Sequence, residues 1–241
     1  MIELLSDPQT YLSLLTLTAL EIVLGIDNIL FISIVSSRLP RDQQEKARRL
    51  GLALALFGRL GLLLSLSWVL SLTKPFFSLL GHEISGRDLV LGIGGLFLIY
   101  KATQEIFFHL EVKDSNNSDE KPRFMTMRSA IVQIVMLDIV FSLDSIITAI
   151  GLVSHVAIMA VAIIIAVIIM LFFSGIISEF LDRHPSMKVL GLAFLLMVGV
   201  LLVAECFGYA IPRAYIYFSL AFSVAVEVVN IKHREYTQRK K

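Results

Sequence analysis

The sequence holds a single cysteine, Cys206, among its 241 residues, so one chain has neither a disulfide nor a cysteine-rich metal site. Charged residues are also scarce, at 17%, and they nearly cancel to a net charge of +1. This balance predicts no nucleic-acid partner. The sequence has no P-loop motif for nucleotide phosphates. The N-terminal stretch MIELLSDPQTY lacks the basic start of a signal peptide, so we expect no cleavage.

Apolar residues make up 56% of the chain, and the mean hydropathy is +0.81. They form long runs between short charged stretches, and a membrane-spanning helix needs about 20 such residues. Helices are expected because lipid excludes irregular backbone. The sequence therefore predicts an all-α membrane protein with seven transmembrane helices, at residues 10–35, 50–72, 88–108, 129–152, 155–180, 188–206 and 212–230.

Lysine and arginine predict the orientation of these helices. They concentrate in the segments 36–49, 109–128 and 181–188 and in the C-terminal tail. The opposite side carries only Lys74, Arg87 and Arg213. Because basic loops stay in the cytoplasm, we expect the N-terminus outside and the C-terminus inside.

Two stretches repeat one pattern, EIVLGIDNI at 21–29 and DIVFSLDSI at 138–146. Each lies in the first helix of a predicted group of three helices, an odd number, so the two copies are expected to be inverted in the membrane. Inverted repeats are a transporter architecture with a substrate site near the midplane. We predict a first repeat at 1–110, a cytoplasmic linker at 111–128, a second, inverted repeat at 129–206, and a seventh helix with a basic cytoplasmic tail at 207–241.

Each copy of the pattern places two acids inside a predicted helix. An acid near the bilayer centre costs about 2.5–3.5 kcal/mol on insertion scales. Arg59 and Lys101, the basic residues well inside the predicted helices, are candidate counter-ions. Two cations do not neutralise four carboxylates, whereas an added divalent cation would. Structural hydrogen bonding between helices is the alternative, and the recurrence of the acids favours a functional role.

The donor atoms of the two motifs are oxygens, from carboxylates, an amide and a hydroxyl. Such donors suit hard cations such as Mn²⁺, Mg²⁺ or Ca²⁺, and the residues alone do not choose among these three. The predicted metal-handling residues are Glu21, Asp27, Asn28, Asp138, Asp144 and Ser145.

Gly25 and Ser142 lie between the two acids of each motif and are candidate helix breaks. Breaks at both would allow one midplane site. Regular helices would instead give two layers roughly 9 Å apart, with Glu21 beside Asp144 and Asp27 beside Asp138. We favour the layered arrangement, since a single glycine rarely breaks a spanning helix.

The two motifs, EIVLGIDNI at 21–29 and LDIVFSLDSIITAIGLV at 137–153, resemble the paired signatures of the TerC family of bacterial membrane proteins. The resemblance continues through most of the chain, in GGLFLIYKATQEI at 94–106, RHPSMKVLGLAFLLMVG at 183–199 and YIYFSLAFSVAVEVVN at 215–230. It implies the compact seven-helix branch of a LysE-like exporter group, located in the bacterial plasma membrane. It also implies manganese export, or metal supply to exported enzymes, and it assigns metal handling to the six residues above.

We therefore expect a secondary transporter that exports Mn²⁺ by alternating access, with the ion held between the first and fourth helices. The alternative is an accessory membrane protein that binds metal and supplies it to proteins at the secretion machinery. We expect no enzymatic activity, because the aspartates lack the GxGD-type pattern of a membrane aspartic protease. No prosthetic group is expected, and the expected partners are the lipid bilayer and the transported metal ion.

Overall fold

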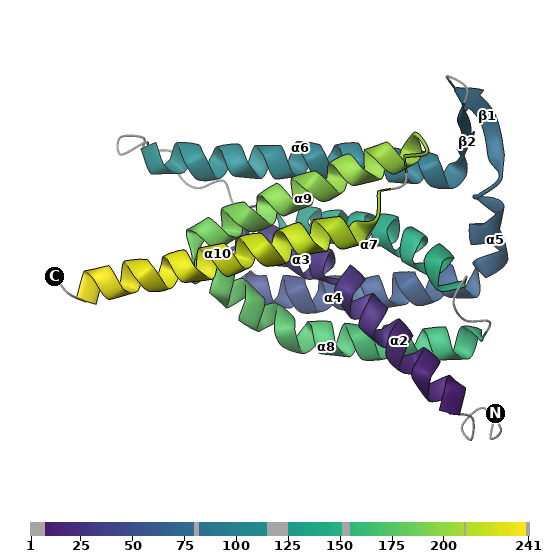
Figure 1. The fold of residues 1–241 in the computed structure, drawn as a ribbon, viewed down its shortest axis with the longest axis horizontal. Helices are drawn as coiled ribbons and strands as arrows, with labels where there is room; N and C mark the ends of the chain where they lie inside the picture. Colours follow the sequence, from purple (N-terminus) through teal and green to yellow (C-terminus); the bar gives the residue numbers. More distant parts are fainter. Residues whose placement is uncertain (1–7, 80–81, 115–124, 151–154, 210, 240–241) are drawn as a thin grey trace. The chain divides into compact units, whose positions relative to one another are not determined.

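The computed structural model describes residues 8–79, 82–114, 125–150, 155–209 and 211–239, almost all of them in helices (Figure 1). The predicted linker lies partly outside the described residues, at 115–124. The elements are α2 (Pro8–Leu24), α3 (Ile26–Ser37), α4 (Arg41–Leu64), α5 (Leu66–Ser71), β1 (Pro75–Leu79), β2 (His82–Ser85), α6 (Gly86–Asp114), α7 (Met127–Ile150), α8 (Val156–Arg183), α9 (Pro185–Cys206) and α10 (Arg213–Arg239).

Six described segments are long and apolar enough to cross a membrane: Gln9–Ser37, Gly86–Phe108, Met127–Ala149, Val156–Arg183, Pro185–Cys206 and Arg213–His233. Each overlaps one predicted span. The remaining prediction, 50–72, falls on α4 and α5, which do not meet that standard. The arginines of α4, including the buried Arg59, lower its hydropathy.

The chain divides into two compact units. The first contains Met1–Val90 and Lys121–Phe180, and the second contains Leu91–Glu120 and Leu181–Lys241. Within the first unit, α3, α4 and α7 pack against one another (Figure 1). Within the second, α9 packs on α10, and α6 approaches α9 closely where Gly95 faces Gly199. Both units combine helices from the two predicted repeats, and the repeat symmetry itself stays a prediction.

The first motif contains a helix break, which corrects our expectation of a regular helix there. Gly25 separates α2 from α3, and its N–H donates to the carbonyl oxygen of Ile22 at 3.1 Å, one residue closer along the chain than an α-helix requires. Met170 of α8 fills the space beside it, because a Cβ on Gly25 would lie 2.6 Å from the Met170 sulfur. The second motif differs, since α7 passes through Ser142 without a break.

A short antiparallel hairpin, which the sequence did not lead us to expect, precedes α6. Phe77 pairs with Ile84, Ser78 with Glu83 and Leu79 with His82. The backbone N–H of Arg87 then donates to the carbonyl oxygen of Leu72 at 3.0 Å. The hairpin therefore fixes where α6 begins and where Arg87 lies.

We predict that Gly25→Ala lowers stability by about 1–3 kcal/mol, because its Cβ would lie 2.6 Å from the Met170 sulfur and 2.9 Å from the backbone carbonyl oxygen of Glu21. Gly58→Ala in α4 is the matched control, since its Cβ would meet no heavy atom within 4 Å. There the gain in helix propensity should leave stability equal or about 0.5–1 kcal/mol higher. Thermal unfolding of the purified protein in detergent measures both. Equal melting temperatures for the two variants would contradict the close packing at Gly25.

Candidate functional site

All six predicted metal-handling residues are buried, with exposed fractions between 2% and 6%. They belong to the first compact unit. One comes from the end of α2, two from the first turn of α3 and three from α7: Glu21, Asp27, Asn28, Asp138, Asp144 and Ser145. The two motifs therefore meet in one interior region.

Arg59 of α4 joins the two motifs. Its Nη1 donates to Glu21 Oε2 at 2.8 Å, and its Nη2 and Nε donate to Asp138 Oδ1 at 2.7 and 3.1 Å. The guanidinium is 3% exposed. A planar fork of donors on a carboxylate is among the stronger protein ion pairs, and here it ties α2, α4 and α7 together.

Asp138 accepts further hydrogen bonds on both carboxylate oxygens. Asn28 Nδ2 donates to Oδ1 at 3.2 Å, and Ser142 Oγ donates to Oδ2 at 3.1 Å. Ser142, which we considered as a helix break, is therefore a hydrogen-bond donor in an intact helix. Each motif thus contributes a polar neighbour to the same aspartate.

A second arginine, Arg87, pairs with Asp144 through Nη2. Arg87 also lies 3.5 Å from Asp88, whose carboxylate accepts hydrogen bonds from the Ser85 backbone and hydroxyl. We did not predict this role, because an arginine at a helix start is usually interfacial. One feature of the sequence could have indicated this pair. In the predicted topology, Asp144 and the start of the third helix lie on the same, outer side of the membrane midplane.

The predicted layers are wrong in their pairing. Glu21 shares Arg59 with Asp138, and Asp144 is held by Arg87. The physical reason is the length of the arginine side chain, which crosses the axial gap that we took to separate two layers. Asn28, the neighbour of Asp27, donates to Asp138.

Within the described residues, no three His, Cys, Asp or Glu side chains form a group that could hold a metal ion. Glu21, Asp138 and Asp144 are instead engaged by guanidinium groups. Beside Glu21, apolar side chains including Leu17, Ile146 and Met159 leave a gap too small for a water molecule. The metal role of the six residues therefore stays a prediction.

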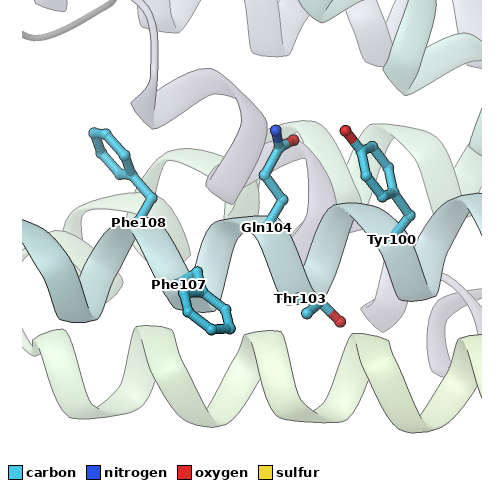
Figure 2. Close-up of a pocket in the computed structure, with 5 residues that line it drawn as sticks. All are labelled: Tyr100, Thr103, Gln104, Phe107 and Phe108. Carbon is cyan, nitrogen blue, oxygen red and sulfur yellow. The ribbon is translucent and has the colours of Figure 1, made fainter.

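The second unit offers a different environment. Lys101, the other candidate counter-ion, lies there on α6, with its Nζ 3.4 Å from Gln104 Oε1. A pocket of about 450 Å³ on the same helix is open and has no carboxylate in its lining. Figure 2 shows its lining residues on two sides of α6, Tyr100, Gln104 and Phe108 on one and Thr103 and Phe107 on the other. This pocket therefore lacks the negatively charged ligands of the first unit.

Comparison with known proteins settles the family. A family model described as the integral membrane protein TerC family matches residues 6–241. The chain belongs to the TerC family. This confirms the resemblance in the two motifs, and it makes the chain a multi-pass membrane protein.

Three relatives illustrate the match. A UPF0053 protein of Haemophilus influenzae is 50% identical over 234 residues, which cover 97% of this chain and 98% of the relative. The UPF0053 inner membrane protein YgdQ of Escherichia coli K12 is 51% identical over 227 residues, 94% of each chain. The inner membrane protein YoaE of the same strain is 48% identical over 95% of this chain but 44% of its own length. These relatives support a bacterial inner membrane location. No solved structure matches significantly.

We predict that Asp138→Asn destabilises the protein by about 3 kcal/mol, because it removes one of the two carboxylates that form ion pairs with the buried Arg59 in the described residues. Glu45→Gln is the control, since it breaks the exposed Glu45–Arg49 pair of the same helix α4, worth about 0.3–0.5 kcal/mol. Unfolding free energies in mixed detergent micelles compare the two. If Asp138→Asn lowered the free energy of unfolding by less than Glu45→Gln does, the buried Arg59–Asp138 pair would not contribute more to stability than an exposed pair.

Proposed function

We propose that this TerC family protein is a secondary transporter that exports a hard divalent cation, foremost Mn²⁺, from the cytoplasm. The observation that carries the proposal is the buried charge cluster of the first unit. Its four carboxylates, Glu21, Asp27, Asp138 and Asp144, outnumber the two guanidinium groups seen to pair with members of the cluster. One added divalent cation would balance the six side chains.

The cost of buried charge supports this reading. Buried ion pairs rarely add stability over apolar packing, since desolvating the charges offsets their attraction. A membrane protein that needed only to hold its helices together could use small residues and uncharged hydrogen-bonding side chains, which cost less to bury than charged ones. Retention of four buried carboxylates and the buried Arg59 in one region therefore favours a role in handling ions.

The donor atoms support the class of ion. Besides the carboxylates, the cluster contains the Asn28 amide and the Ser145 hydroxyl, both buried. Oxygen donors of this kind suit Mn²⁺, Mg²⁺ and Ca²⁺. The choice of Mn²⁺ among them rests on the resemblance to manganese-associated members of the TerC family.

The proposed mechanism is alternating access of two inverted repeats, with the N-terminus outside and the C-terminus in the cytoplasm. Helices α2 and α3 belong to the first repeat and α7 to the second, so the ion would be held where the repeats meet. In the loaded state the carboxylates would close on the ion in place of the guanidinium contacts. An ion gradient, or the metal gradient itself, would drive the movement.

We predict that Asp27→Ala and Asp144→Ala reduce Mn²⁺ uptake into proteoliposomes to the level of empty liposomes, because each removes a buried carboxylate of the cluster. Glu179→Ala and Glu227→Ala are the controls, since Glu179 is exposed and Glu227 lies in the second unit, where it accepts a hydrogen bond from Asn230. These two variants should keep most of the activity. Mg²⁺ and Ca²⁺ are tested beside Mn²⁺.

If all four variants, reconstituted in equal amounts, lost Mn²⁺ uptake to the same extent, the buried carboxylates would have no specific role in transport. Wild-type protein that binds Mn²⁺ without moving it would favour the other function, an accessory protein that supplies metal to exported proteins at the secretion machinery.

We also predict that bound metal has oxygen ligands only. Crystals soaked in Mn²⁺ should show an anomalous peak among the α2, α3 and α7 carboxylates, at metal–oxygen distances of about 2.0–2.6 Å. A peak confined to histidine side chains or to Cys206 would contradict the site.

A further inference from the structure

Arg59 holds the place that a transported cation would take. It is buried, it is supplied by α4, and it donates to Glu21 of the first motif and Asp138 of the second. A cation bound between the two motifs would need these same two carboxylates. Arg59 is therefore a positive charge already seated between them.

A metal ion and this guanidinium compete for the same oxygen atoms. Asp138 Oδ1 accepts from Arg59 Nη2, Arg59 Nε and Asn28 Nδ2, and Oδ2 accepts from Ser142 Oγ. A carboxylate has about four lone-pair positions, so Asp138 has little capacity left for a metal at about 2.0–2.6 Å. Metal binding at Asp138 therefore requires Arg59 to withdraw.

We propose that Arg59 is a tethered internal cation, which replaces the transported metal in the unloaded protein and withdraws when metal binds. This inference rests on the proposed transport function and concerns its empty state. Because Arg59 offsets one of the two carboxylate charges that metal release leaves at Glu21 and Asp138, the empty site can reorient across the membrane without another metal ion at these two residues.

The chemistry of arginine fits this role. Its guanidinium stays charged at any physiological pH, so the compensation does not depend on proton supply. Its side chain is long and flexible, and it is anchored on a different helix from either carboxylate. A withdrawn guanidinium stays tethered close by, so it re-enters as soon as the metal leaves.

The test compares two transport modes in proteoliposomes. Net uptake requires the empty binding site to reorient from one side of the membrane to the other. Exchange of radioactive for unlabelled Mn²⁺ requires only that the metal-loaded site reorients. In Arg59→Gln, net uptake should fall on the order of 100-fold, as expected when buried charges lose their partner, while exchange stays within about threefold of wild type. Arg59→Lys, which keeps a tethered charge, should recover part of the net uptake.

Arg48→Gln is the matched control. Arg48 also lies on α4, but it donates to Ser178 at 3.3 Å. Both modes should stay at the wild-type level in this variant.

Equilibrium binding separates this role from a purely structural one. Without its competitor the site should bind Mn²⁺ at least about tenfold more tightly in Arg59→Gln, whereas a disrupted site would bind it more weakly. Parallel loss of net uptake and exchange, or retention of both, overturns the inference while wild-type transport stands. Wild-type protein that moves no metal in either mode overturns the transport function as well.

If Arg59→Gln does not fold, a structure of the wild-type protein with bound Mn²⁺ tests the inference instead. A Mn²⁺-loaded structure in which Arg59 keeps its contacts to Glu21 and Asp138 overturns the inference, and one in which these contacts are broken supports it.

Discussion

The first unit depends on the buried guanidinium of Arg59. In lipid the hydrophobic effect does not drive helices together, so small-residue packing and polar contacts decide which helices meet. Arg59 makes such contacts with α2 and α7 at once, and each carboxylate is buried. An unpaired charge in this region costs several kcal/mol. In the protein without metal, arrangements of the three helices that separate Arg59 from its partners are therefore strongly disfavoured.

The two motifs share a sequence pattern but differ in structure. In α7 the helix is unbroken, so Asp138 and Asp144 lie about 9 Å apart along its axis and face different arginines, Arg59 and Arg87. In the first motif the helix is interrupted at Gly25, between α2 and α3. The second motif therefore presents two aspartates on one continuous helix, whereas the first motif contains an interruption at which the helix could bend.

Most of the fold could be predicted from the sequence, because long apolar runs and charged loops mark the helices directly. The strand pair Pro75–Leu79 and His82–Ser85 could not, since its strands are short and lack a clear alternation of apolar and polar residues. The burial of the acids and their need for counter-ions could also be predicted. Arg59 was predicted as a counter-ion, and its ion pairs with Glu21 and Asp138 confirm this. Arg87 was not, because its position at a helix start resembles that of an interfacial residue.

The interruption at Gly25 lies between two residues of the first motif that both connect to Asp138. Glu21 and Asn28 are seven residues apart and would share one face of a regular helix, separated by about 10 Å. Asn28 touches Asp138 directly, and Glu21 reaches it through Arg59. After withdrawal of Arg59, Glu21 and Asp138 would have to close the space left by the guanidinium in order to share an ion, and a bend between Glu21 and Asn28 would allow this. A joint at Gly25, with the flexible Met170 side chain packed beside it, is where such a bend would cost least.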